Sequence, residues 1–167
     1  MSQSDPSVDF TLSRVFDAPR ELVFQTMVDA AHLRKWWGPQ GCTIEVLRNE
    51  PQPGGVFHYV MRFMPGVEMH GRFDWRELDA PGRLVFVNGF ADAAGQRVRH
   101  PMSPGWPLEV LNTVTLTEEG GRTALTLVAS PQGASEIERQ TFKAGHASLQ
   151  QGFGGMYDAY ARYLTTL

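Results

Sequence analysis

The most constraining feature of the sequence is a long run of strand patterns between Cys42 and Ser130. Apolar and polar residues alternate there with the period of two that is typical of strands with one buried face. Short turn signals, QPGG, MPGV, DAPG and EEGGR, separate most of the strands and predict antiparallel pairing. The expected strands are CTIEVLRNE, VFHYVMRF, EMHGRFDWRE, RLVFVNGF, EVLNTVTLTE and RTALTLVAS.

Further elements flank these six strands. Residues 8–13 alternate as one more strand, and DAPRELVFQTMVDAAHL after them has helical spacing, with Asp17 as the expected N-cap. This helical pattern breaks near RKWWGPQG. After Pro131 the remaining chain is predicted to form one long helix, with Ser135 and Glu138 in the spacing of a capping box. The order indicates an α+β protein.

Composition excludes several classes of function. The length of 167 residues favours a single domain, 1–167, of which we expect residues 1–7 to be flexible. Scattered Lys and Arg and a net charge of -3 argue against nucleic-acid binding. No apolar run reaches the roughly 18 residues that span a membrane. The single cysteine and an N-terminus without the features of a signal peptide favour a cytoplasmic protein.

Strand register predicts which side chains share the covered face of the sheet. An even sum of paired residue numbers, such as 132, would place His58 opposite Asp74 on the outer face. The turn in EEGGR should pair Leu116 with Leu125. An apolar face with a few polar groups is typical of a ligand pocket, although an ordinary core is the alternative. The residues of interest on this face are Tyr59, Met61, Phe73, Trp75, Phe86, Asn88 and Asn112.

The C-terminal helix has three glycines within four positions, Gly152, Gly154 and Gly155. A glycine inside a helix costs roughly 1 kcal/mol relative to alanine, so a compensating reason is needed. We interpret the missing side chains as the wall of a pocket; the alternative is close packing of a strand or another chain. On the apolar face of this helix lie His146, Leu149, Phe153 and Met156.

Few residues are candidates for catalysis. The five histidines show no metal-ligand spacing and one cysteine cannot supply a thiolate cluster, so no metal and no cofactor is expected. General acid–base chemistry would need a titratable group beside the substrate, and His146 and Glu109 are the candidates. The alternatives are a core histidine bonded to a backbone carbonyl or an asparagine, and a solvated glutamate. Whether the chain is an enzyme stays open.

Several motifs together resemble a known superfamily. They are FDAPRELVF, KWWGP, the PGG before a strand, GRFDWRELDAPGRLVF, LNTVTLTEEGGRTALTL and QQGFGGMYDAYARYL. In this order, over residues 8–166, they are similar to the SRPBCC or START-like (Bet v 1-like) superfamily, in the branch of activator of Hsp-90 ATPase homologue proteins. The resemblance implies a helix-grip fold: a curved antiparallel sheet of about seven strands around the long C-terminal helix, with two short helices between the first two strands. This chain has Gly152-Phe153 where the family usually has Gly-Trp.

The resemblance implies an internal apolar cavity but names no ligand, because a fold does not determine a function. We expect a soluble protein that binds a small apolar or aromatic ligand, including lipids. Trp36 and Trp37 should border the cavity mouth, one contacting ligand and the other packing on the sheet. The loop 90–107, with Trp106, is either a lid or a contact surface, such as that of a homodimer. The predicted ligand-binding set is Trp36, Trp37, Tyr59, Met61, Phe73, Trp75, Phe86, Asn88, Asn112, His146, Leu149, Phe153 and Met156.

Two other functions stay open. The first is an enzyme of the cyclase or isomerase type that uses the same cavity. The second is a co-chaperone-like stress-response module that acts on an ATPase, although the sequence shows no long charged run of the kind expected for docking. The ligand-binding protein is the preferred hypothesis.

Overall fold

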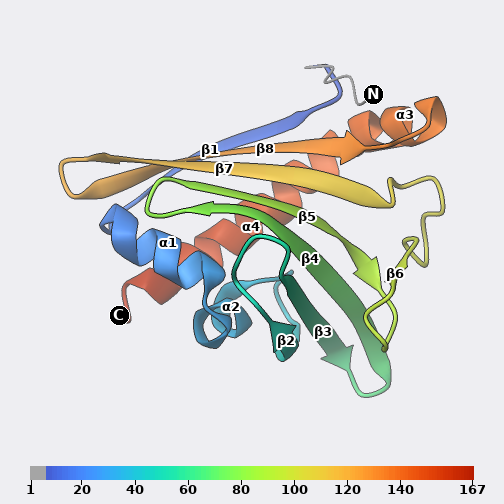
Figure 1. Ribbon diagram of the computed structural model, residues 1–167, viewed down its shortest axis with the longest axis horizontal. Coiled ribbons are helices and arrows are strands. Elements are labelled where there is room, and N and C mark those ends of the chain that lie inside the picture. The colour runs from blue at the N-terminus through green and yellow to red at the C-terminus, as the bar shows by residue number, and fades with distance from the viewer. Residues whose placement is uncertain (1–6) are drawn as a thin grey trace.

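The computed structural model describes residues 7–167 and shows an eight-stranded antiparallel sheet with four helices (Figure 1). The prediction that residues 1–7 are flexible falls, apart from Ser7, outside the described residues. The strands are β1 (Phe10–Phe16), β2 (Thr43–Asn49), β3 (Val56–Met64), β4 (Val67–Asp79), β5 (Arg83–Ala91), β6 (Arg97–Val98), β7 (Glu109–Glu119) and β8 (Arg122–Gln132). The helices are α1 (Arg20–Val28), α2 (Ala30–Trp36), α3 (Glu136–Ala144) and α4 (His146–Leu164).

The sheet is a meander that the N-terminal strand extends at one edge. Its order is β1-β8-β7-β5-β4-β3-β2, and the two-residue β6 pairs with β5. Each expected strand is present, and Leu116 pairs with Leu125 as predicted. The α+β fold, with a curved antiparallel sheet, is therefore confirmed.

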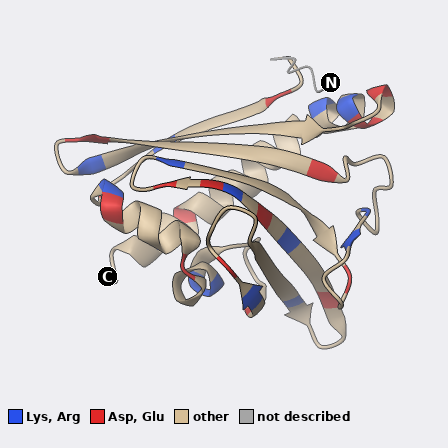
Figure 2. Cartoon of the chain, viewed as in Figure 1, with Lys and Arg blue, Asp and Glu red and all other residues tan. Residues whose placement is uncertain are grey.

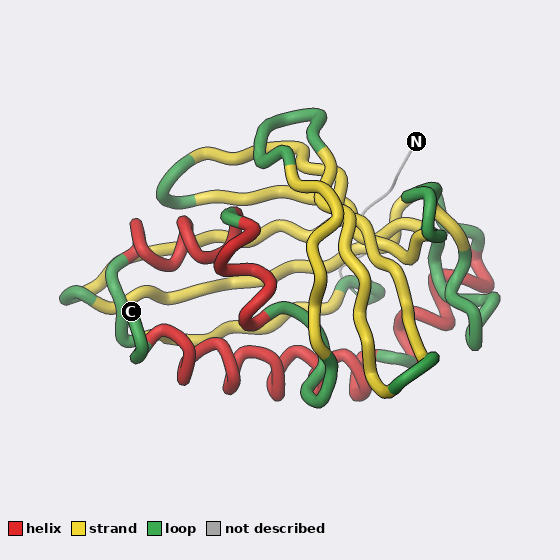
Figure 3. The backbone as a smooth tube through the Cα atoms, turned by 90° about the horizontal axis from the view of Figure 1, so that it is seen from below, coloured by secondary structure: helices red, strands yellow, loops and turns green. Residues whose placement is uncertain are grey.

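The sheet curves around the helices, with α4 lying along its concave side (Figure 3). The two short helices expected between the first two strands are α1 and α2, which meet at Asp29. The Asp29 carboxylate caps α2 by accepting the Ala31 N–H at 2.9 Å. The prediction of Asp17 as N-cap was wrong, because α1 begins after Pro19 without a side-chain cap.

The C-terminal helical segment is interrupted at Gly145, which ends α3 and precedes α4. The predicted capping box is confirmed: Ser135 and Glu138 bond reciprocally at the start of α3. At Gly145 an added Cβ would lie 2.8 Å from the Trp106 ring, so the indole occupies the space of a side chain. The long helix is therefore α4 alone.

The pairing of β3 with β4 differs in detail from the prediction. The paired residue numbers do have an even sum, so the inner face is as expected, but His58 is opposite Arg72. The two-residue turn at positions 65–66 and a bulge between Arg62 and Met64 each move the partners by one residue, from the predicted sum of 132 to 130. The predicted pair of His58 with Asp74 was therefore wrong, and Nε2 of His58 lies 2.9 Å from Nδ1 of His70.

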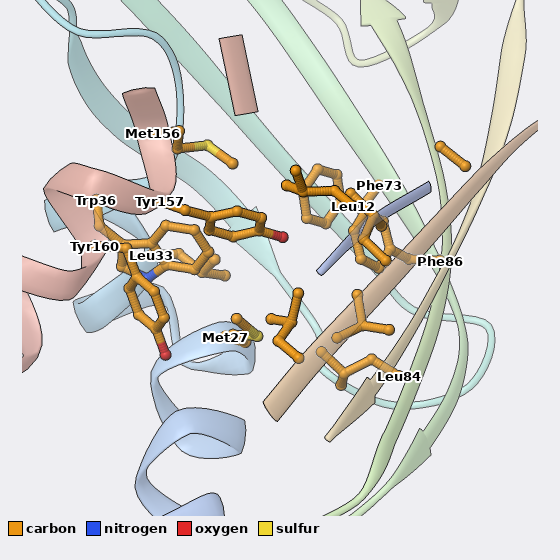
Figure 4. Packing of buried hydrophobic residues seen from close by; sticks show 14 of the residues in the cluster. Leu12, Met27, Leu33, Trp36, Phe73, Leu84, Phe86, Met156, Tyr157 and Tyr160 are labelled. Atoms are coloured by element: carbon orange, nitrogen blue, oxygen red, sulfur yellow. The ribbon is translucent and has the colours of Figure 1, made fainter. Parts of the chain in front are cut away.

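The densest core lies where α1, α2 and the C-terminal half of α4 meet the sheet (Figure 4). Trp36, Tyr157 and Tyr160 face Phe73 and Phe86 across this core (Figure 4). At the opposite end of the sheet, side chains of α3 and of the segment 92–108 line a cavity. Acidic and basic residues are interspersed over the strands and helices (Figure 2).

Candidate ligand-binding site

Two adjoining cavities lie between the inner face of the sheet and α4. The larger has a volume of about 390 Å³ and the smaller one of about 210 Å³. Small-molecule sites typically measure roughly 300–1,000 Å³ and are mostly apolar. The two volumes together fall within this range. Both cavities are lined by Tyr59, Met61, Ser148, Leu149 and Phe153.

Two asparagines supply polar groups to the larger cavity. Asn88 on β5 and Asn112 on β7 both line it, and Asn112 is 1% exposed. Nδ2 of Asn112 donates to Oδ1 of Asn88 at 2.8 Å and to the carbonyl oxygen of Val110 at 3.1 Å. Strand alternation explains this placement, because each asparagine is in phase with buried apolar neighbours on its own strand.

Tyr59 on β3 is the one tyrosine among the described residues that line the two cavities. It pairs with Gly71 on β4, where any side chain would collide with the phenol ring. Glycine at position 71 therefore lets the ring lie across the neighbouring strand. Burial raises the pKa of Tyr59 to about 12, and a hydrogen bond with Trp37 offsets part of the rise. The phenol is therefore neutral at physiological pH.

The loop between β6 and β7 forms one wall of the larger cavity. The Trp106 ring packs 5.2 Å from Phe142 of α3, and the His100 ring packs 4.5 Å from Phe90 of β5. Nδ1 of His100 accepts the Met102 N–H at 3.0 Å, and burial lowers the pKa of His100. These contacts make the loop a packed wall of the cavity.

Several predicted ligand-binding residues line one or both cavities: Trp37, Tyr59, Met61, Asn88, Asn112, Leu149, Phe153 and Met156. Others are placed in the dense core. Trp36, Phe73 and Phe86 surround a residual space of only about 10 Å³, which cannot hold a ligand. Trp75 is fully buried, and its Nε1 donates to Oδ1 of Asn49 at 3.1 Å.

The adjacent tryptophans Trp36 and Trp37 have different surroundings. Trp36 is buried, lies 4.2 Å from the Tyr160 ring and donates from Nε1 to the Thr26 carbonyl at 2.8 Å. Trp37 follows the end of α2, packs edge-on against Phe73 and lines the smaller cavity. The second indole is therefore the one beside the cavities.

Neither of the two candidate catalytic residues is among the residues that line the described cavities. His146 donates from Nε2 to the Val8 carbonyl at 2.7 Å, and its ring packs between Phe10 and Phe142. This is the arrangement of a core histidine bonded to a backbone carbonyl. Glu109 pairs with Arg97, whose Nε lies 3.6 Å from Oε1 of Glu109.

The three helix glycines are not sites of close packing. An added Cβ at Gly152 or Gly154 would meet no atom within 4 Å, and at Gly155 only Nε2 of Gln40 at 3.9 Å. Gly152 lines the smaller cavity, whereas Gly154 and Gly155 are absent from the described linings. The interpretation as a pocket wall is therefore restricted to Gly152.

The Gly154→Ala variant is expected to raise the free energy of unfolding by about 0.5–1 kcal/mol, because alanine favours the helix and has open space there. Gly145→Ala is the matched control and should destabilise, since its Cβ would press on Trp106. Urea denaturation followed by tryptophan fluorescence measures both. Equal changes in the two variants would contradict this account of the glycines.

Sequence reasoning missed part of the larger cavity. Phe90 and Val110 lie two residues from the asparagines on the same strands, so alternation alone could have found them. His100 and Ser103 come from an irregular loop, where no periodicity predicts which side chains point inward. Trp106 was noted only as a member of that loop. The remaining members missed are Gly71, Gly89, Pro107, Ala129, Phe142 and Ser148.

Other kinds of site receive no support from residues 7–167. No three His, Cys, Asp or Glu side chains in this range are grouped closely enough to hold a metal ion. Within the same range, no helix has the length and apolar character needed to cross a membrane.

Solved structures from bacteria share the fold. A crystal structure of protein Ms6760 from Mycobacterium smegmatis is 25% identical, with a TM-score of 0.76 over 97% of this chain and 93% of the other. A solution structure from Arthrobacter aurescens is 24% identical, with a TM-score of 0.76 over 93% and 86%. The AHSA1 protein SPO3351 from Silicibacter pomeroyi is 21% identical, with a TM-score of 0.67 over 95% and 98%.

Comparison of the sequence with family models identifies the family of the chain more specifically than the shared fold does. No curated protein matches the chain. The family model described as Activator of Hsp90 ATPase homolog 1-like protein matches residues 17–165, which is nearly the whole sequence. The chain therefore belongs to the Activator of Hsp90 ATPase homolog 1-like family.

Proposed function

We propose that this protein binds a small apolar or aromatic molecule in the two adjoining cavities. The observation that carries the proposal is a space of about 390 Å³, continued by one of about 210 Å³, with walls that are mainly aromatic and aliphatic. Burial of apolar ligand surface supplies roughly 25 cal/mol per Å² removed from water, so such walls favour an apolar occupant. The asparagine pair supplies a polar contact for orientation.

Neutral aromatic probes test the proposal. 2-Acetylnaphthalene and its hydrocarbon isostere 2-isopropenylnaphthalene are expected to raise the melting temperature of the protein, since a ligand that binds only the folded state stabilises it. The Ala129→Leu variant should show a smaller shift, because Ala129 lines the larger cavity and leucine would occupy part of it. Isothermal titration calorimetry then gives the affinities.

A matched pair of helix variants tests in the same assay whether a bound probe occupies the smaller cavity. Gly152→Leu should weaken binding of any probe that extends into it, because Gly152 lines it. Gly154→Leu adds the same side chain two residues away and should bind like the parent. The proposal fails if neither probe stabilises the parent. If the parent binds but Ala129→Leu and Gly152→Leu bind equally well, the site lies elsewhere.

The other expectations stay predictions beside this proposal. An enzyme of the cyclase or isomerase type would use the same cavities, and Tyr59 and His100 are the titratable side chains that line them among the described residues. A co-chaperone-like stress-response role, a homodimer, the one-domain organisation and the cytoplasmic location each rest on the sequence alone. Stoichiometric recovery of a chaperone ATPase in a pull-down would favour the co-chaperone-like role over ligand binding.

A further inference from the structure

Hydrogen bonds on the inner face of the sheet determine how the Asn112 amide is oriented. Its Nδ2 lies 3.1 Å from the carbonyl oxygen of Val110 and 2.8 Å from Oδ1 of Asn88. A backbone carbonyl can only accept, so Val110 requires the amino end of the Asn112 amide to face it. Both N–H groups of Asn112 are then used, one on Val110 and one on Asn88.

The orientation of Asn112 in turn determines that of Asn88. Because Asn112 presents an N–H, Asn88 must receive it with its carbonyl oxygen. The amino group of Asn88 therefore has its two N–H donors left, and it has no acceptor among residues 7–167. Asn88 lines the larger cavity, so this amino group is available to a molecule bound there.

The cavity walls carry no compensating charge. Among the described residues, no Asp, Glu, Lys or Arg lines either cavity. Burial keeps Tyr59 and His100 in their neutral forms at neutral pH, since it raises the pKa of the phenol and lowers that of the imidazole. A charged ligand would lose its hydration here without gaining a partner of opposite charge.

We propose that the ligand is uncharged and carries a carbonyl group on its apolar or aromatic body, and that the Asn88 amide donates a hydrogen bond to the carbonyl oxygen. The inference rests on the proposed function and narrows its ligand class. A hydrocarbon of the same shape would cover the Asn88 amino group without bonding it, and a carboxylate would enter without a counter-charge.

Three naphthalene probes separate these possibilities by calorimetry. 2-Acetylnaphthalene carries the carbonyl, 2-isopropenylnaphthalene replaces the oxygen by a methylene group, and 2-naphthoate carries a negative charge. The ketone and the alkene should both bind the parent, and the naphthoate should bind more weakly than either. The quantity that reports the Asn88 contact is the ratio of ketone affinity to alkene affinity.

Substitution of Asn88 should change this ratio without removing the cavity. In Asn88→Leu the ratio is expected to fall roughly tenfold, because the ketone loses a hydrogen bond that the alkene cannot make. Asn88→Asp keeps an acceptor for the Asn112 N–H but presents an oxygen, in place of an N–H donor, to the carbonyl of the ketone. The ratio of ketone affinity to alkene affinity should therefore fall at least as far as in Asn88→Leu. Melting temperatures show whether each variant is folded.

An infrared measurement on the parent needs no variant. The carbonyl stretch of isotope-labelled 2-acetylnaphthalene should lie at lower frequency in the protein than in an alkane solvent, as a hydrogen-bonded carbonyl does. An unshifted stretch, a ratio that is the same in parent and folded variants, or tightest binding of 2-naphthoate would each overturn the inference and leave the cavity as a binding site. Failure of both neutral probes to bind would instead remove the proposed function, and the inference with it.

Discussion

The Trp36→Ala variant is expected to lose about 3–5 kcal/mol in its free energy of unfolding. Trp36 is 5% exposed and lies in the dense core between α2 and α4, 4.2 Å from the Tyr160 ring. Truncation would leave a large void there, and the Thr26 carbonyl would lose the hydrogen bond that it accepts from the indole. Equilibrium denaturation in urea measures the loss.

Trp37→Ala is the control because it removes the same side chain one residue further along. Trp37 is only partly buried and lines the smaller cavity. Its removal should destabilise the protein less than the loss of Trp36, and should change the affinity for 2-acetylnaphthalene instead. Equal losses of stability in the two variants would contradict the assignment of Trp36 to the core and of Trp37 to the cavity wall.

The strands and their pairing order were predictable because their signals are local. Alternation marks each strand, and EEGGR requires a turn that pairs Leu116 with Leu125. The pairing of His58 was not predictable, because it results from a two-residue turn combined with a one-residue bulge after Arg62, and the bulge has no signature in the sequence. The contact of Gly145, where the last helix breaks, with the Trp106 ring was not predictable either, because that ring comes from a distant loop.

The candidate site was predictable only as a face of the sheet. Phe73 and Asn88 are cross-strand partners with the same inward orientation, yet Phe73 belongs to the dense core and Asn88 to the cavity. Alternation gives the face of a side chain but not whether a helix packs against it. Trp36 and Phe86 share the core because α1 and α2 fill that end of the sheet, which is a tertiary property (Figure 4).

The second substitution with a large expected effect on stability is at Asp74, on the outer face of the sheet. Its Oδ1 accepts from Nε of Arg72 at 2.6 Å, and its Oδ2 lies 3.2 Å from Nη2 of Arg97. The side chain of Arg97 is 11% exposed, and its guanidinium lies over Gly89, where any side chain would collide with it. Glu109 approaches Arg97 no closer than 3.6 Å, so Asp74 is its nearest counter-charge among the described ion pairs.

The Asp74→Ala variant is therefore expected to lose about 3 kcal/mol of stability at neutral pH, because the buried guanidinium nitrogens of Arg97 would be left without the carboxylate that faces them. Burial raises the pKa of Asp74, but Arg72 and Arg97 outweigh it and hold that pKa below its usual value. The stabilisation is thus present above the unfolded-state pKa and is lost as pH falls through the folded-state value. Urea denaturation of the parent and of Asp74→Ala across this pH range should show that the substitution costs less stability in acid than at neutral pH.

A second substitution distinguishes an unpaired charge from lost packing. Asp74→Ala combined with Arg97→Met should recover more than half of the lost stability, because no buried guanidinium is then left without its carboxylate. Glu77→Ala is the surface control: Glu77 and its partner Arg83 are both well exposed, so its loss should cost less than about 1 kcal/mol. If the double variant is no more stable than Asp74→Ala, the carboxylate acts through its contact with Arg72 rather than by neutralising Arg97.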